Sequence, residues 1–197
     1  MKKLLMTICL VAAFLIISSP AMALVTVDFE GIPENYLYFG GNQNLGAYYA
    51  GLNFGPDATI LDQFRHGYNW VLFPSHSGDA VLTSVSVPSI RVDFLGSTTN
   101  YVEAWYTSLS TLYLEAYDAG DNLLANTSGS SNNETNSLIS LSWGPGNIAY
   151  IIFHDNSSQF TLDDFAYEAN VIPAPGAILL GSIGISLVGW LRRRRTL

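Results

Sequence analysis

Two short segments of the chain carry aromatic and acidic side chains at alternating positions. They run from Tyr101 to Thr107 and from Thr111 to Tyr117, with three residues between them. Successive side chains of a strand point to opposite faces of a sheet. Pairing the two segments as a hairpin therefore places six side chains on one face: Tyr101, Glu103, Trp105, Tyr113, Glu115 and Tyr117. Flat rings beside carboxylates suit sugar rings and their hydroxyl groups, and we interpret this set as a glycan-binding site.

Two features of this hairpin leave alternatives open. Its register places Glu103 opposite Glu115, and like charges directly opposite each other are destabilising unless a polar ligand, a cation or a neighbouring arginine such as Arg91 relieves them. The connection Ser108-Leu109-Ser110 contains no glycine, so it defines the register weakly. One alternative is that a loop covers these six side chains. The other is that the register of the hairpin is shifted by one residue.

The sequence offers little for catalysis. It contains no G-x-S-x-G, no H-E-x-x-H and no glycine-rich phosphate loop, and the three histidines, His66, His76 and His154, lie far apart. A triad using His154 and Asp155 with a distant serine remains open, as does a carboxylate pair for glycoside hydrolysis, but no spacing selects either. We therefore predict no catalytic residues and a protein that is not an enzyme.

The charges are distributed very unevenly. The chain has 197 residues, of which 49% are hydrophobic and 12% charged, so it has enough apolar residues to build a core. Six of its eight basic residues lie at the two ends, and the middle keeps only Arg65 and Arg91 beside all sixteen acidic residues, a formal charge of −14. A nucleic-acid binder needs a basic face, so this class is excluded. Divalent cations or neutral polar surfaces such as glycans suit this middle region better.

The N-terminus has the pattern of a secretory signal. Two lysines at positions 2 and 3 precede an apolar stretch from Leu4 to Ile17, and Ala21-Met22-Ala23 has the small-x-small form of a cleavage site. We predict a signal peptide over residues 1–23; the alternative is a retained anchor. The only cysteine, Cys9, lies in this segment, so the mature chain would have no disulfide and no thiolate ligand.

The C-terminus has three parts. Pro173-Ala174-Pro175, within a linker over residues 169–175, precedes an apolar run from Gly176 to Leu191 and then four arginines, Arg192, Arg193, Arg194 and Arg195. We predict a transmembrane helix over 176–191 and a basic cytoplasmic tail over 192–197, because positive residues stay on the cytoplasmic side. By the residues alone, a plain tail anchor and a processed sorting signal are both open.

This tail resembles that of the bacterial PEP-CTERM proteins, which carry a Pro-Glu-Pro motif, a hydrophobic helix and a terminal arginine cluster. The chain departs from the family at Ala174, where the motif has Glu. The resemblance implies sorting by the membrane protease exosortase, an intermediate in the inner membrane, and final placement at the cell surface or in the extracellular matrix. It also implies a Gram-negative host that makes extracellular polysaccharide.

Between the two ends, short β segments alternate with turn residues. Period-2 alternation is clear in Ile90, Val92 and Phe94, which flank Arg91 and Asp93. About ten strands at this spacing predict an all-β domain over residues 24–168, an antiparallel β-sandwich with a jelly roll as the favoured topology. The expected strands are Val25–Glu30, Ala47–Phe54, Trp70–Phe73, Ala80–Val87, Ile90–Leu95, Tyr101–Thr107, Thr111–Tyr117, Ser137–Trp143, Ile148–His154 and Gln159–Tyr167.

The body also resembles the galactose-binding-like jelly rolls. The residues that carry this resemblance are Val27 to Gly31, Tyr49 to Phe54 and Phe160 to Phe165. In that fold, carboxylates of the first and last strands frequently hold a structural calcium ion, which prefers oxygen ligands. The resemblance implies calcium at the matching positions Asp28, Glu30, Asp163 and Asp164, with Asp28 and Glu30 on one face of a strand. The alternative is a set of ordinary solvated or backbone-bonded acids.

These patterns together predict an exported surface or matrix protein with a non-catalytic glycan-binding module. Its expected partners are an exosortase-like sorting protease, the membrane before processing, and exopolysaccharide. The main alternative is a structural matrix protein without a discrete ligand, followed by a glycan-active hydrolase. Exposed aromatic side chains beside carboxylates would favour glycan binding, and a fully buried aromatic set would favour the structural role.

Overall fold

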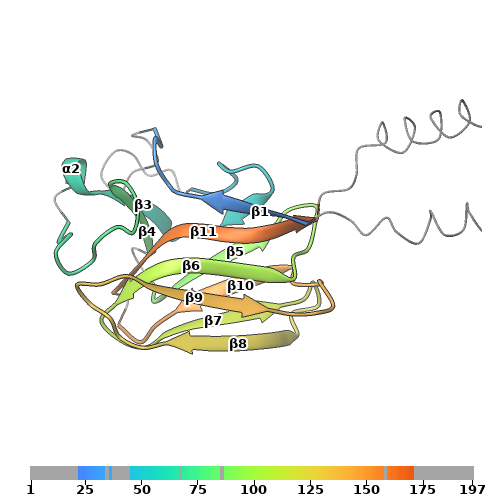
Figure 1. The fold of residues 1–197 in the computed structure, drawn as a ribbon. Helices are drawn as coiled ribbons and strands as arrows, with labels where there is room; N and C mark the ends of the chain where they lie inside the picture. The colour runs from blue at the N-terminus through green and yellow to red at the C-terminus, as the bar shows by residue number, and fades with distance from the viewer. Residues whose placement is uncertain are drawn as a thin grey trace, which may run out of the picture. The chain divides into compact units, whose positions relative to one another are not determined.

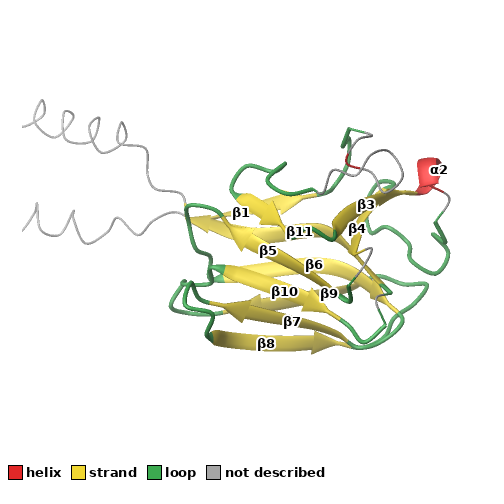
Figure 2. Ribbon diagram, turned by 180° about the vertical axis from the view of Figure 1, so that it is seen from behind, coloured by secondary structure: helices red, strands yellow, loops and turns green. Residues whose placement is uncertain are grey.

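A computed structural model describes residues 22–33, 36, 45–66, 68–84, 87–157 and 159–170. The sorting motif, the predicted transmembrane helix and the basic tail lie outside the described residues, as does the predicted signal peptide up to position 21. Within the described part, no helix is long and apolar enough to cross a membrane. Strands dominate this part of the chain, and the one labelled helix is the single turn α2 (Gln63–His66) (Figure 2).

The strands form two antiparallel sheets that lie one behind the other (Figure 1). The first sheet has the order β3-β4-β11-β6-β9, and β1 pairs with β11. Its strands are β1 (Met22–Val27), β3 (Ala58–Asp62), β4 (Ala80–Ser84), β6 (Tyr101–Ser108), β9 (Ser137–Ser142) and β11 (Phe160–Asn170). The predicted two-layer all-β architecture is therefore confirmed.

The second sheet has the order β2-β5-β10-β7-β8. Its strands are β2 (Leu52–Phe54), β5 (Ser89–Phe94), β7 (Leu112–Tyr117), β8 (Leu123–Gly129) and β10 (Tyr150–His154). β10 is the central strand, paired with β5 on one side and with β7 on the other. Its neighbours in the sheet are thus distant in sequence, and the middle of this sheet's outer face combines side chains from three separate segments, β5, β10 and β7.

Alternation along the strands places the core between the sheets. In β5, Ile90, Val92 and Phe94 are buried at 1%, 0% and 6% exposure, while Arg91 and Asp93 point outward. The described buried hydrophobic residues all lie between Val27 and Tyr167. Residues 24–169 form one compact unit that contains the core and both sheets except for the ends of β1 and β11.

One predicted strand, Trp70–Phe73, is a turn in the structure. The N–H groups of Leu72 and Phe73 both donate to the carbonyl of Asn69, at 3.1 and 3.0 Å, so the backbone bonds locally and pairs with no strand. Trp70 and Val71 are 57% and 55% exposed. An apolar run that is exposed on a loop has the same composition as a buried strand, which explains the wrong prediction.

Candidate functional site

The structure separates the two segments that the sequence pairs as a hairpin. β6 pairs with β11 and β9 in the first sheet, whereas β7 pairs with β10 and β8 in the second. The residues between them cross from one sheet to the other: the N–H of Leu109 donates to the carbonyl of Gln159, and the Ser110 hydroxyl donates to Asp155. The predicted hairpin is therefore wrong.

The six predicted glycan-binding side chains consequently form two groups on opposite outer faces. Tyr101, Glu103 and Trp105 alternate along β6 with Val102, Ala104 and Tyr106, which are buried in the core. Tyr113, Glu115 and Tyr117 alternate along β7 with the buried Leu114 and Ala116. The opposition of Glu103 and Glu115 does not arise, because the two residues belong to different sheets.

The group on the first sheet is covered in part by a loop. The ring of His76 stacks on Trp105, with centroids 3.7 Å apart and an angle of 7° between the planes. The Tyr101 hydroxyl donates to its neighbour Glu103 at 2.5 Å. The indole face that a sugar ring would need is thus already occupied by an imidazole.

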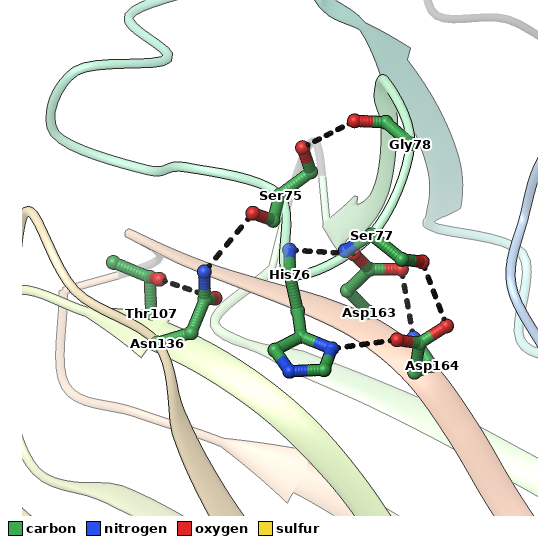
Figure 3. A network of polar contacts seen from close by, with 8 residues as sticks. All are labelled: Ser75, His76, Ser77, Gly78, Thr107, Asn136, Asp163 and Asp164. Carbon is green, nitrogen blue, oxygen red and sulfur yellow. Dashed lines mark hydrogen bonds and ion pairs between the residues drawn. The ribbon is translucent and has the colours of Figure 1, made fainter.

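A polar network holds this loop, residues 75–78, against β11 (Figure 3). Asp163 accepts hydrogen bonds from the backbone N–H groups of His76 and Ser77, at 2.7 and 2.8 Å. Asp164 accepts from the Ser77 hydroxyl at 2.8 Å and lies 2.7 Å from Nδ1 of His76. From the other side, Nδ2 of Asn136 donates to the carbonyl of Ser75 at 3.1 Å. The network fixes His76 over Trp105.

Three of the four predicted calcium ligands surround this same stretch of chain. Besides Asp163 and Asp164, Glu30 accepts hydrogen bonds from the N–H groups of Asp79 and Ala80, at 2.8 and 2.9 Å. These carboxylates bind protein donors, which matches the alternative of backbone-bonded acids. Among the described residues, no group of three or more histidine, cysteine, aspartate or glutamate side chains is arranged to hold a metal. A structural calcium ion therefore stays a prediction.

The local geometry of the fourth residue, Asp28, differs from the prediction. β1 ends at Val27, and Phe29 adopts a positive φ of 61°, so Asp28 and Glu30 do not alternate along a strand. Asp28 is exposed, and its carboxylate accepts a hydrogen bond from the N–H of Glu30 at 3.2 Å. The prediction that both side chains share one face of a strand is wrong, because the left-handed residue between them ends the strand.

Burial has a clear effect on Asp163. The residue is 1% exposed, and the loss of hydration raises the pKa of its carboxyl group to about 6. The hydrogen bonds from the N–H groups of Ser77, Asp164 and His76 oppose this rise in pKa because they stabilise the ionised form. Asp163 therefore holds the 75–78 loop through hydrogen bonds, but its ionised carboxyl group loses hydration on burial.

The second sheet presents a different arrangement on its outer face, which we call the Tyr150 face. The face combines outward side chains of β5, β10 and β7: Arg91, Asp93, Tyr113, Glu115, Tyr117, Tyr150, Ile152 and His154, with Ile152 paired between Arg91 and Glu115. The rings of Tyr117 and Tyr150 stack with centroids 4.9 Å apart and planes 6° apart. Cζ of Arg91 lies 3.6 Å from the centroid of the Tyr150 ring. Because β10 lies between β5 and β7, Tyr150 is held between a guanidinium and a second ring.

Glu115 connects two ring pairs on this face. The second pair is Tyr113 and His154, with centroids 5.1 Å apart and planes 16° apart. Glu115 accepts a hydrogen bond from the Tyr117 hydroxyl at 2.6 Å and lies 3.5 Å from Nε2 of His154. The hydrogen bond to Glu115, more than burial, raises the pKa of Tyr117 to about 12. Its hydroxyl is thus a neutral donor near pH 7.

The other edge of the face is an ion pair. Arg91 binds Asp93 through Nε at 2.8 Å and through Nη2 at 2.7 Å, and Nδ2 of Asn53 donates to the same carboxylate at 3.3 Å. The side chain of Arg91 stays 46% exposed, so it remains accessible to a ligand. The Tyr150 hydroxyl donates to Asp121, in the turn after β7, at 3.0 Å. Donors and acceptors thus lie beside the rings.

Sequence reasoning found Tyr113, Glu115 and Tyr117 but did not assign Asp93, Tyr150 or His154 to a site. The alternation in β5 identifies Arg91 and Asp93 as outward residues, so their position on an outer face could be predicted from the sequence. β10 gave no such signal, because a central strand with Ile151 and Ile152 adjacent is apolar on both faces. Only the register across β5, β10 and β7 shows that these side chains meet.

The chain was compared with known proteins. No protein-family model matches the chain, and neither does any curated protein. Among solved structures, the K2 cleaved adhesin domain of Lys-gingipain has a TM-score of 0.48 at 15% identity, covering 74% of this chain and 99% of that one. The K1 domain of the same protein, from Porphyromonas gingivalis W83, has a TM-score of 0.46 at 14% identity, covering 75% and 99%. A family 29 carbohydrate-binding module from Piromyces equi has a TM-score of 0.44 at 12% identity, covering 75% and 91%.

Proposed function

We propose that the domain over residues 24–168 is a non-catalytic glycan-binding module and that the Tyr150 face is its binding surface. The observation that carries this proposal is one sheet face on which rings, a guanidinium and carboxylates hold one another in place and remain partly open to solvent. Sugar hydroxyls both donate and accept hydrogen bonds, while sugar C–H groups pack on aromatic rings. The Tyr150 face supplies partners for all three contacts.

The contacts within the face divide its residues into supporting and binding groups. Tyr150 is only 6% exposed, so its ring supports Arg91 and Tyr117 more than it contacts a ligand. Tyr113 is 36% exposed and, together with the half-buried Tyr117, supplies accessible ring surface. Side chains that are already fixed by stacking and hydrogen bonds lose little conformational entropy when a ligand binds. The packing of the face therefore favours affinity.

The outer face of the first sheet is the natural comparison. It also carries a tyrosine, a glutamate and a tryptophan, but His76 stacks on Trp105 and the network of Asp163 and Asp164 fixes His76 there. We therefore assign glycan binding to Tyr113, Glu115 and Tyr117 and a structural role to Tyr101, Glu103 and Trp105.

Binding of the 24–169 unit to the host's own exopolysaccharide tests this assignment. Replacing Tyr113 or Arg91 with alanine is expected to weaken binding by roughly fivefold or more, because each substitution removes an exposed contact, and losing one such contact costs about 1 kcal/mol or more. Tyr101→Ala, on the opposite sheet, is the matched control and is expected to bind as the wild type does. The melting temperature of each variant confirms that it is folded.

Equal binding by the folded Tyr113→Ala variant, the Arg91→Ala variant and the wild type would remove the Tyr150 face as the site. Failure of the wild type to bind any polysaccharide would favour the structural matrix protein instead.

We also propose that the protein is exported and sorted to the cell surface or matrix. Support for this comes from the N-terminal lysines with their apolar stretch and from the proline motif, apolar run and arginine cluster at the other end. Mass spectrometry of surface material should find a mature chain without residues 176–197. An intact C-terminus would identify the tail as a plain anchor.

A further inference from the structure

We infer that the Tyr150 face selects neutral glycans and rejects chains that carry uronate or sulfate groups. This inference rests on the proposed function and specifies the class of ligand. It follows from the charges on the face and from how they are already paired.

Carboxylates outnumber the cation on this face. Asp93 and Glu115 lie on it, and Asp121 reaches the Tyr150 hydroxyl from the adjoining turn. The only arginine or lysine among the residues of the face is Arg91, and both Nε and Nη2 of its guanidinium contact the same oxygen of Asp93. His154 is the remaining titratable nitrogen, and its Nε2 lies 3.5 Å from Glu115. An anionic sugar would compete with carboxylates that are already in place.

The rest of the body offers no compensating cation. Between the chain ends, the basic side chains are Arg65 and Arg91 against sixteen acidic residues. Arg65 lies on α2, where Nε is 3.6 Å from the carboxylate of Asp62. The field of the whole domain is therefore negative and slows the approach of a polyanion as well as weakening its contacts.

A neutral sugar has none of these penalties. Each carboxylate oxygen can accept more than one hydrogen bond, so the hydroxyls of a sugar can donate to the remaining lone pairs of Asp93 and Glu115. They can also accept from the exposed edge of Arg91 without separating the ion pair. Hydrogen bonds that involve a charged partner are the stronger ones. The acidic surface that repels a polyanion thus supplies acceptors for a neutral chain.

Binding of the 24–169 unit to two sets of soluble polysaccharides of similar length tests this inference. The neutral set is glucomannan and xyloglucan, and the acidic set is alginate and chondroitin sulfate. At about 0.05 M salt, we expect the affinity for the neutral set to be at least roughly tenfold higher than the affinity for the acidic set. Raising the salt to about 0.5 M should change neutral binding by less than about twofold, because no net charge is neutralised in the complex.

A charge variant gives a second, independent result. Asp93→Asn combined with Glu115→Gln keeps the shapes of both side chains and removes two negative charges, one of them the ion-pair partner of Arg91. We expect this variant to bind alginate roughly tenfold better than the wild type does at low salt. The matched control is Glu103→Gln combined with Glu168→Gln, which removes two charges from strands of the opposite sheet. It should raise alginate binding much less than the variant on the Tyr150 face does, because its two charges lie farther from the bound chain.

The outcomes separate this inference from the proposal on which it rests. A wild type that binds alginate as tightly as glucomannan, and loses both through Arg91→Ala, overturns the selection for neutral chains and keeps the Tyr150 face as a glycan site. A wild type that binds neither set overturns the glycan-binding function itself.

Discussion

Replacing Phe165 with alanine is expected to lower the free energy of unfolding of the 24–169 unit by about 3–5 kcal/mol. Phe165 is 1% exposed and lies on β11 of the first sheet. Its ring packs edge-on against Phe54 and Phe153 of the second sheet, each with centroids 6.3 Å away. The substitution would leave a cavity where the two sheets meet.

Denaturant unfolding of the purified unit measures this loss. The control is Leu138→Ala, which removes a 48% exposed side chain from β9 and should cost less than about 1 kcal/mol. Similar losses for the two variants would contradict the placement of Phe165 at the centre of the sandwich.

Alternation in the sequence was sufficient to locate most of the sandwich. β5, β6, β7 and β9 each have one buried and one outward face, so their period-2 pattern predicts them to within a few residues. A strand was also predicted at β10, and β10 pairs with a neighbour on both sides. These predictions succeed because the burial of one sheet face is a local property of each segment.

Two strands had no such signal. β3 and β8 end the two sheet orders, and neither was among the predicted strands. β8 contains Asn126, Thr127 and Ser128, and none of its described side chains is fully buried. An edge strand of this kind is held by backbone hydrogen bonds to a single neighbour, here β7, and such bonds do not depend on apolar side chains.

The candidate site could be predicted only in part for a related reason. Alternation identifies Tyr113, Glu115 and Tyr117 as outward residues but does not say which strands lie beside them. Their actual neighbours, Tyr150 and His154, lie more than thirty positions away along the chain. A hairpin with β6 was predicted because β6 is the strand nearest to β7 in sequence. The chain instead crosses to the other sheet at residues 109–111.

The buried carboxyl group of Asp163 makes the stability of the domain depend on pH in a way that can be isolated. Its pKa in the folded protein is about 6, above the ordinary value of 3.8, so folding favours the protonated form. The contribution of this group is fully present below pH 3.8 and is lost as the pH rises through 6. A difference of this size corresponds to about 3 kcal/mol in total, of which about 2 kcal/mol is lost between pH 4 and pH 7.

Comparison of the wild type with Asp163→Asn in calcium-free buffer measures this contribution together with its coupling to Asp164, because carboxyl groups away from Asp163 titrate alike in both proteins. The stability of the wild type relative to the variant should fall by about 2 kcal/mol from pH 4 to pH 7. Asp118→Asn is a control of opposite sign, since hydrogen bonds from Asn122 lower the pKa of Asp118. A stability difference that does not change with pH would contradict the raised pKa of Asp163. A calcium ion at Asp163 would favour the ionised carboxylate, so loss of this pH dependence on adding calcium would establish the calcium site that the sequence predicts.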